Sequence, residues 1–251
     1  MLGNNSGYMF CVIRTDNTNT MENYSTTKVV NASTVSTLLK SVYLQMAAAL
    51  SVTGLVAYYL SQSIDFWTFL AENASLIWVI LFAQLGLVMW ISARIMSMSM
   101  STATILFILY SALMGVTMSS IFMIYTSESI ASVFFITAGM FLAMSIIGYV
   151  TRMNLSGVGH VLFMALIGIV IASVVNIFLQ SEMLYWVISY AGVVIFTGLA
   201  AYDTQKIKQM LVEYGTADEM GHKLALFGAL TLYLDFINLF LFLLRIFGNR
   251  K

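Results

Sequence analysis

One long apolar stretch near the carboxyl end most constrains how this chain can fold. Residues 224–247, LALFGALTLYLDFINLFLFLLRIF, are long enough to cross the hydrocarbon core of a bilayer as a helix. They carry a single acid, Asp235, near the middle, and a lone carboxylate in hydrocarbon costs several kcal/mol unless it is compensated. Helical spacing places this acid in a partly polar stripe on one face of the helix: Thr231, Asp235, Asn238, Phe242 and Arg245. That face is expected to point into a helix bundle and not into lipid.

The composition fixes the broad class of the protein. Of the 251 residues, 60% are hydrophobic and 9% are charged, which leaves too little polar surface for a soluble domain of this length. The formal net charge is zero, so there is no basic surface of the kind that binds nucleic acid. Cys11 is the only cysteine, which excludes an internal disulfide and a cysteine-based metal site. The chain is therefore predicted to be an all-α polytopic membrane protein.

The polar segment 1–37 precedes the membrane region. It is rich in Asn, Thr and Ser and lacks the apolar core and cleavage site of a secretory signal, so we expect a flexible amino-terminal tail. Translation starts at Met1 or at Met21. Residues 38–251 are expected to form one transmembrane domain, with a short loop that contains Asp65 and Glu72 after the first span. Seven membrane segments are predicted: 42–60, 76–91, 103–125, 130–150, 158–179, 183–202 and 224–247.

The basic residues fall in alternate loops. Basic side chains lie before the first segment, between the second and third, between the fourth and fifth, and between the sixth and seventh, whereas the other loops carry only acids. The positive-inside rule then places the amino terminus in the cytoplasm. Seven full crossings would put Arg245, Arg250 and Lys251 outside, against that rule, so the last segment is a full span or a re-entrant hairpin. We favour the full span because residues 224–246 are long enough.

A second carboxylate, Asp203, lies at the end of the sixth segment in TGLAAYDTQKIK. Its ordinary interpretation is a surface acid that pairs with Lys206 one turn on or caps a helix. The following segment, however, carries Asp235. Two carboxylates in contact in a poorly solvated site cannot both ionise easily, so they share one proton and titrate as a coupled pair. If the two acids meet, they form a proton sensor.

The depth of Asp235 sets a condition for this pairing. If the last helix entered the membrane at Leu224, Asp235 would lie about 16 Å along it, well below Asp203. Contact requires the sixth helix to continue past Asp203 toward Gly215 and the last helix to begin outside the bilayer near Asp218. The segment DTQKIKQMLVEYG is rich in helix formers and ends in a glycine, which favours such an extension.

Two motifs carry a family resemblance. AAYDTQKIK followed by LYLDFINLFLFLLRIFG resembles the closing signature of the Bax inhibitor family, the transmembrane Bax inhibitor motif proteins. SARIMSMS and YSALMGVTMSSIF resemble the middle segments of the same family, and the match extends over residues 42–248. The resemblance implies a bundle of six helices around a central carboxy-terminal helix. The fold expected is thus a seven-helix transmembrane bundle.

The resemblance also implies a function. Bacterial members that resemble this chain are pH-sensitive calcium leak channels, in which the two motif carboxylates share a proton and an arginine latches the closed form. The resemblance implies that Asp203 and Asp235 form the pair, which would bind permeant calcium weakly and transiently. It also implies that Arg94 is the latch. Asn238 and Tyr202 are candidates for the ion path. We expect an integral protein of the bacterial inner membrane that meets lipid, calcium ions and protons, has no cofactor and is not an enzyme.

Two other classes use paired intramembrane acids. Tyr202 and Asp203 match the YD motif of intramembrane aspartyl proteases, but Asp235 follows LYL and not a glycine-rich turn, and a chain without proline lacks their Pro-Ala-Leu element. A proton-coupled transporter with the two acids as its relay stays open, although no inverted repeat is visible. His160 and His222, the only histidines, lie near segment ends and are interpreted as interface residues.

Overall fold

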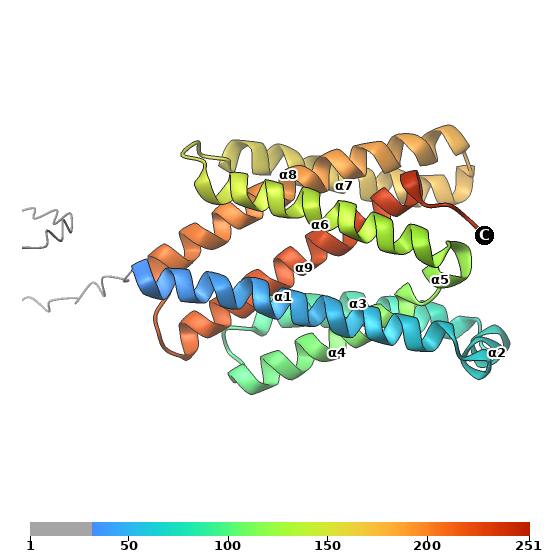
Figure 1. Cartoon of the computed structure of the whole chain (residues 1–251), viewed down its shortest axis with the longest axis horizontal. Helices are drawn as coiled ribbons and strands as arrows, with labels where there is room; N and C mark the ends of the chain where they lie inside the picture. The colour runs from blue at the N-terminus through green and yellow to red at the C-terminus, as the bar shows by residue number, and fades with distance from the viewer. Residues whose placement is uncertain (1–31) are drawn as a thin grey trace, which may run out of the picture.

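The computed structural model describes residues 32–251. Residues 1–31, with the expected flexible tail and both candidate start methionines, lie outside the described residues. The described chain is built from helices, which confirms the all-α prediction (Figure 1). In order they are α1 (Ala32–Ser61), α2 (Ile64–Glu72), α3 (Ser75–Arg94), α4 (Met100–Met118), α5 (Ile121–Ile124), α6 (Ser127–Val150), α7 (Ser156–Leu179), α8 (Glu182–Tyr214) and α9 (Glu219–Phe247).

Seven helical stretches in the described chain are long and apolar enough to cross a membrane. They correspond to the seven predicted segments, with α4 and α5 together forming the third. The seven-helix membrane bundle is therefore confirmed as the fold. The third segment bends after Met118, where α4 ends, and resumes at Ile121 as the short α5.

The first helix begins earlier than the sequence indicated. α1 starts at Ala32, so the residues just before position 38 are helical and do not belong to a tail. The reason is burial, because Val35 and Leu38 lie in the hydrophobic core of the bundle. The polar residues between them lower the average hydrophobicity of this stretch. The apolar spacing of three was therefore not recognised in the sequence.

The loop expected after the first span is also a helix. α2 carries Asp65 in its first turn and Glu72 at its end. The Ser63 hydroxyl caps it by accepting a hydrogen bond from the Phe66 N–H at 3.2 Å. A serine cap followed by an acid in the first turn stabilises a helix start, which explains why this short polar-flanked segment folds.

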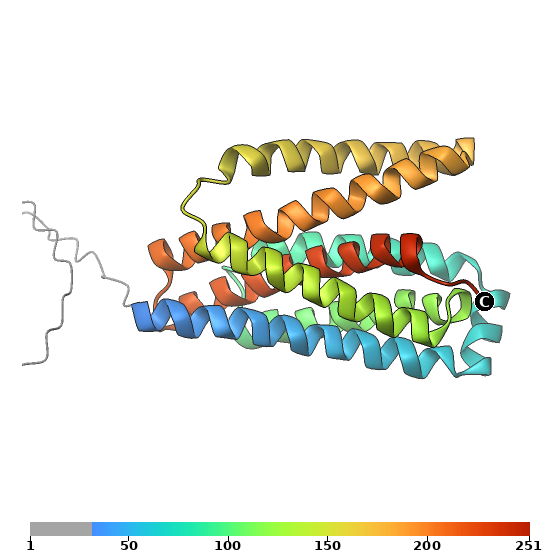
Figure 2. The same ribbon diagram turned by 45° about the horizontal axis from the view of Figure 1, so that its top comes forward.

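α9 is the centre of the bundle. In Figure 1 it runs between α1, α6 and α8, and it packs against all three. Of the most apolar 18-residue stretch of α9, 72% is buried within the protein, whereas only 6% of the corresponding stretch of α7 is buried. The prediction of a central carboxy-terminal helix is confirmed. α7 instead lies at the periphery, where Figure 2 shows it packed along α8 and away from α1.

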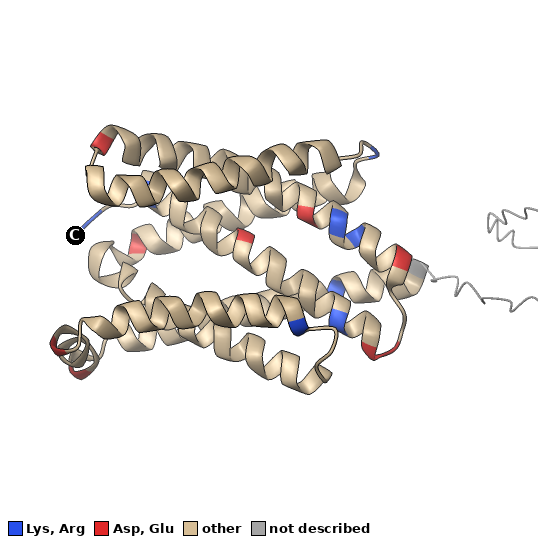
Figure 3. Ribbon diagram, turned by 180° about the vertical axis from the view of Figure 1, so that it is seen from behind, with Lys and Arg blue, Asp and Glu red and all other residues tan. Residues whose placement is uncertain are grey.

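α9 is one continuous helix with no re-entrant hairpin. Its carboxyl end lies at the end of the bundle opposite the start of α1 (Figure 1). Figure 3 shows that Lys and Arg gather at the end where α1 starts, whereas the opposite end is mostly acidic apart from the basic carboxyl terminus. This arrangement agrees with a full crossing. The side on which each end lies stays a prediction from the positive-inside rule.

The connection between α8 and α9 has the form that contact between the two acids requires. α8 runs past Asp203 to Tyr214 and is followed by Gly215. α9 begins at Glu219, where the Asp218 side chain accepts hydrogen bonds from the first turn of the helix. Both helices thus extend well beyond the apolar segments read from the sequence, and they cross where the acids lie.

Candidate functional site

Asp203 from α8 and Asp235 from α9 meet. Their carboxyl groups lie close enough to interact with each other, although the two residues lie on different helices. Asp235 is buried, with 6% of its surface exposed, and Asp203 is half-buried. Two carboxyl groups can hydrogen-bond to each other only when at least one carries a proton. The structure therefore has the geometry that a shared proton needs; the sharing itself stays a prediction.

One oxygen of this pair has no partner. The Asp235 Oδ2 atom is buried and makes no hydrogen bond to any described residue. A buried carboxylate oxygen left without a donor is costly, so its presence calls for an explanation. The unpartnered oxygen can accept a hydrogen bond from water or contact a cation.

A cavity of about 630 Å³ adjoins the pair. It lies between α7, α8 and α9 and offers room for on the order of 20 water molecules. All three helices contribute apolar residues to its walls, and most of the polar lining residues come from α8 and α9. The polar lining residues are His160, Tyr202, Asp203, Lys206, Thr231, Asp235 and Asn238. Three members of the polar stripe predicted on α9 therefore face one cavity.

Both residues expected in the ion path, Asn238 and Tyr202, line this cavity. The Asn238 Nδ2 donates to the Leu234 carbonyl at 2.8 Å, which leaves the side-chain oxygen free for a ligand in the cavity. The Tyr202 ring lies against Gly159 of α7, where an added Cβ would come within 2.3 Å of the ring. Only glycine fits there, so this contact sets how closely α7 approaches the site.

Lys206 is the cation of the site. It is exposed, lines the cavity one turn beyond Asp203, and acts on that carboxyl group by its charge. Its Nζ atom lies 5.8 Å from the centre of the Tyr202 ring. No ion pair joins Lys206 to Asp203 in residues 32–251, so the ordinary interpretation of Asp203 as a surface acid bound to its neighbour does not describe the structure.

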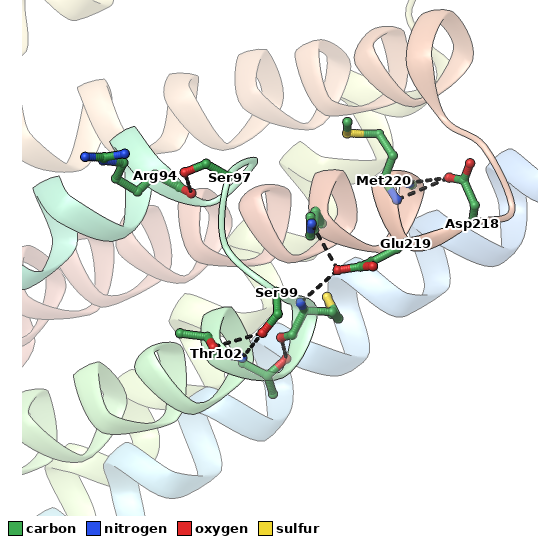
Figure 4. A network of polar contacts seen from close by, with 11 residues as sticks. Arg94, Ser97, Ser99, Thr102, Asp218, Glu219 and Met220 are labelled. Carbon is green, nitrogen blue, oxygen red and sulfur yellow. Dashed lines mark hydrogen bonds and ion pairs between the residues drawn. The ribbon is translucent and has the colours of Figure 1, made fainter.

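Arg94, the predicted latch, is not brought to the acid pair. It ends α3, its side chain is exposed, and within the described chain it forms no ion pair with Asp203 or Asp235. Figure 4 shows the Arg94 side chain directed away from Glu219, while its carbonyl accepts a hydrogen bond from the Ser97 hydroxyl at 2.9 Å. Its role as a latch is not tested by this arrangement.

The loop that follows Arg94 is held by another residue, which the sequence did not single out. Glu219, the first residue of α9, accepts a hydrogen bond from the Met100 N–H at 3.1 Å and pairs with Lys223 at 3.0 Å (Figure 4). The spacing of four residues between Glu219 and Lys223 was the only signal in the sequence. This contact ties the start of α4 to the start of the helix that carries Asp235.

The polar stripe of α9 is interrupted beyond Asn238. Phe242 stacks on Phe196 of α8, with ring centres 5.7 Å apart and planes inclined by 26°. The rings fill the space beside Gly192, because an added Cβ there would lie 2.6 Å from Phe242. Arg245, the last residue of the stripe, lines a different cavity beyond the rings. Phe196 also lines the cavity of the acid pair, so this aromatic contact adjoins the cavity.

Of the two histidines, His160 lines the cavity of the acid pair and His222 does not. His160 is exposed at the mouth of the cavity, where its Nδ1 lies 2.8 Å from the Ser156 carbonyl. No group of three or more His, Cys, Asp or Glu residues within positions 32–251 is arranged to hold a metal ion. A calcium ion at the acid pair would therefore have at most two carboxylates among its ligands.

The comparisons with known proteins agree with this architecture. The model of the family described as inhibitor of apoptosis-promoting Bax1 matches residues 35–251. The inner membrane protein YbhL of Escherichia coli is 53% identical over 216 residues, covering 86% of this chain and 92% of YbhL. A protein of Borreliella burgdorferi is 46% identical, over 85% of this chain and 92% of the relative. RP147 of Rickettsia prowazekii is 43% identical, over 94% of this chain and 99% of RP147.

The chain therefore belongs to the Bax inhibitor-1 family of membrane proteins, as its two motifs indicated. The match includes all seven membrane segments and both acids of the pair.

Proposed function

We propose that this protein is a pH-sensitive cation leak channel of the bacterial inner membrane, with calcium as a permeant ion and the amino terminus in the cytoplasm. The observation that carries the proposal is the contact between Asp203 and Asp235 beside a cavity, with one buried carboxylate oxygen left unpartnered. Titratable groups inside a membrane bundle are functional candidates by default. The inner membrane location is supported by the name of the relative YbhL.

The acid pair supplies the pH response. While the two carboxyl groups share a proton, the pair carries one negative charge and a hydrogen bond that holds α8 to α9. When the proton leaves, two like charges face each other at contact distance, and their repulsion favours separation of the two helices. Acidic pH restores the proton and with it the closed packing. The leak therefore rises as the pH rises.

The stacked rings of Phe196 and Phe242 are the barrier in this proposal. An apolar constriction excludes ions because it sheds water. The two rings come from the same helices as the two acids, α8 and α9. A displacement of α8 relative to α9 would therefore part the rings together with the acids. Opening then joins the cavity of the acid pair to the cavity beyond Phe242.

The chemistry of the cavity suits a transient divalent cation. Calcium prefers oxygen ligands, and the carboxylates, the Asn238 side-chain oxygen and water are available there. Two carboxylates are far short of a closed calcium site. Weak binding is what conduction requires, because an ion that binds tightly does not leave.

The test is a calcium leak assay with the purified protein in liposomes loaded with a calcium-sensitive dye. We expect a leak that increases from acidic to alkaline pH, in excess of the leak of protein-free liposomes. Asp65→Asn, which removes an exposed acid in α2 far from the pair, serves as the control and should keep the wild-type pH profile. A leak that is indifferent to pH would contradict the proposal.

The same vesicles distinguish a channel from a proton-coupled transporter. A channel passes calcium down its gradient whether or not a proton gradient exists. A transporter that uses the acid pair as a relay stops when an ionophore collapses the proton gradient. Parallel vesicles with sodium and potassium gradients measure the ion selectivity.

A further inference from the structure

A second polar cavity lies at the other end of the bundle and goes beyond the proposed leak. It has a volume of about 600 Å³ and is lined by residues from the end of α7, the start of α8 and the carboxyl end of the chain. Two of its lining residues are Arg245 and Arg250, the cations that stand on the side where the other loops are acidic. Basic residues there are against the positive-inside rule, so they need another explanation.

Tyr185 of α8 brings the two arginines together. Its hydroxyl lies 3.3 Å from the Arg250 Nη2, and its ring centre lies 5.7 Å from the Arg245 Cζ. Arg245 also stands over the Phe242 ring at 5.2 Å. Aromatic contacts of this kind hold a guanidinium in place without neutralising it. Two charged groups are therefore kept at one cavity.

The segment that carries Arg250 is fixed to the bundle. Tyr125 and Arg250 form an antiparallel bridge, and the Asn249 N–H donates to the Ser129 hydroxyl at 2.9 Å. Hydrogen bonding to Tyr125, with a smaller contribution from Tyr185, raises the pKa of Arg250 above its ordinary value. The guanidinium is therefore both positioned and permanently charged.

No carboxylate neutralises these arginines. Neither forms an ion pair with any residue in the described part of the chain, although Glu182 lines the same cavity. One carboxylate against two guanidinium groups leaves a net positive charge. The start of α8 also faces the cavity, and the positive end of a helix dipole favours an anion.

Two neutral side chains complete the lining. The Asn176 side-chain oxygen accepts the Ser181 N–H at 3.0 Å, which leaves its amide NH₂ as a donor for a ligand. Gln180 adopts a left-handed conformation with φ of 50°, the only non-glycine residue to do so in residues 32–251. A left-handed residue commonly ends a helix, and Gln180 ends α7 in this way at the wall of the cavity.

We propose that this cavity binds a phosphate group, through Arg245 and Arg250, with the donors of Asn176 and Gln180 beside them. Planar guanidinium groups bind phosphate oxygens in pairs, which makes two arginines the expected lining for this anion. The phosphate comes from a phospholipid headgroup or from free phosphate. Trp186, in the same lining, offers a signal for binding.

The test uses the fluorescence of Trp186 in a variant whose three other tryptophans, Trp67, Trp78 and Trp90, are replaced by phenylalanine. The purified full-length protein is titrated with short-chain phosphatidylglycerol, with a diacylglycerol of the same chains that lacks the phosphate, and with inorganic phosphate. We expect saturable binding of phosphatidylglycerol and none of the diacylglycerol. Saturation by inorganic phosphate as well assigns the site to phosphate itself; its absence assigns it to the lipid headgroup.

Charge-neutral variants give the decisive comparison. Arg245→Gln with Arg250→Gln should weaken phosphatidylglycerol binding at least about tenfold. Arg245→Lys with Arg250→Lys keeps both charges and the fold but loses the paired geometry, so it should weaken binding by a smaller factor. Arg152→Gln, an exposed arginine at the opposite end, should leave binding unchanged. Equal binding of phosphatidylglycerol and diacylglycerol, or full binding by the double Gln variant, would overturn the proposal and leave the arginines as anchors of the carboxyl terminus.

Discussion

α9 carries two polar clusters that lie on opposite faces of the same helix. Tyr233 and Asp235 are two positions apart, which separates their side chains by about 200° around the helix axis. Tyr233 faces α1 and α4, where its hydroxyl lies 2.7 Å from that of Thr53. The Thr53 hydroxyl also lies 2.9 Å from the Ser111 carbonyl and 3.0 Å from the Ala49 carbonyl, between which it shares its proton. Every polar group in this cluster has a partner.

The opposite face is built differently. Asp235 is as deeply buried as a core residue, yet one of its oxygens has no partner and a cavity adjoins it. Tyr233, on the other face, instead makes edge-on contacts with the rings of Phe107 and Tyr110. The comparison teaches that polarity inside a membrane bundle does not by itself mark a functional site. What distinguishes the face of Asp235 is that its unpartnered oxygen, a cavity and a second acid occur together.

The largest effect is expected from Tyr233→Ala. It removes a wholly buried ring, leaves a cavity and deprives Thr53 of its partner, so we expect a loss of about 3–5 kcal/mol in the free energy of unfolding. Asp235→Asn should change stability by less than about 1 kcal/mol or raise it, because it removes a buried acid that lacks a full set of partners. Thermal unfolding in detergent measures both.

An equal loss of stability in the two variants would mean that Asp235 is a structural residue like Tyr233. The difference between the two faces of α9 would then have no functional meaning.

The next effect concerns the pH profile of the leak. A single shared proton lets the leak change by at most about tenfold per pH unit. Asp203→Asn and Asp235→Asn each remove the partner that makes sharing possible, so both should abolish the wild-type midpoint and resemble each other. The double variant should add little, because the coupling is already lost. Additive shifts in the calcium leak assay would instead indicate two independent acids.

A smaller effect is expected from Lys206→Gln. The positive charge of Lys206 favours ionisation of the acid pair, so its removal should move the midpoint of the leak to higher pH. Lys206 is exposed and screened by solvent, so the shift should be about half a pH unit. Arg94→Gln is the matched comparison: a latch would change the size of the leak and leave its midpoint in place. A midpoint shift in Arg94→Gln alone would make Arg94, and not Lys206, the cation of the site.

The sequence predicted the parts of this molecule that depend on a single helix. The period of α9 placed Thr231, Asp235 and Asn238 on one face, and Gly215 and Asp218 marked the helix ends that allow the acids to meet. These signals are local, because they arise from spacing and capping within one segment. Asp203 was predicted as the partner because it ends the preceding segment, and the family resemblance implies the same pair.

What the sequence did not predict depends on how helices rotate against each other. Phe196 lies opposite Phe242, and Glu219 reaches the Met100 N–H from 119 positions away, through packing that no spacing rule records. Arg94 ends a helix that has no polar stripe, and its one buried polar residue, Gln84, was not recognised as marking the inward face. α7 also has no polar stripe, so the sequence did not indicate that His160 and Gly159 form part of the cavity wall.

The central place of α9 sets an order of assembly. Six membrane spans precede it in the chain, and α1, α6 and α8 all use it as their shared packing surface. During synthesis these spans enter the bilayer before α9 does. Thr53 and Asp203 contact their partners on α9, Tyr233 and Asp235, only once α9 is in place. The arrival of one helix therefore completes the bundle and assembles the acid pair in the same event, so a chain that stops before α9 lacks both the shared packing surface and the acid pair.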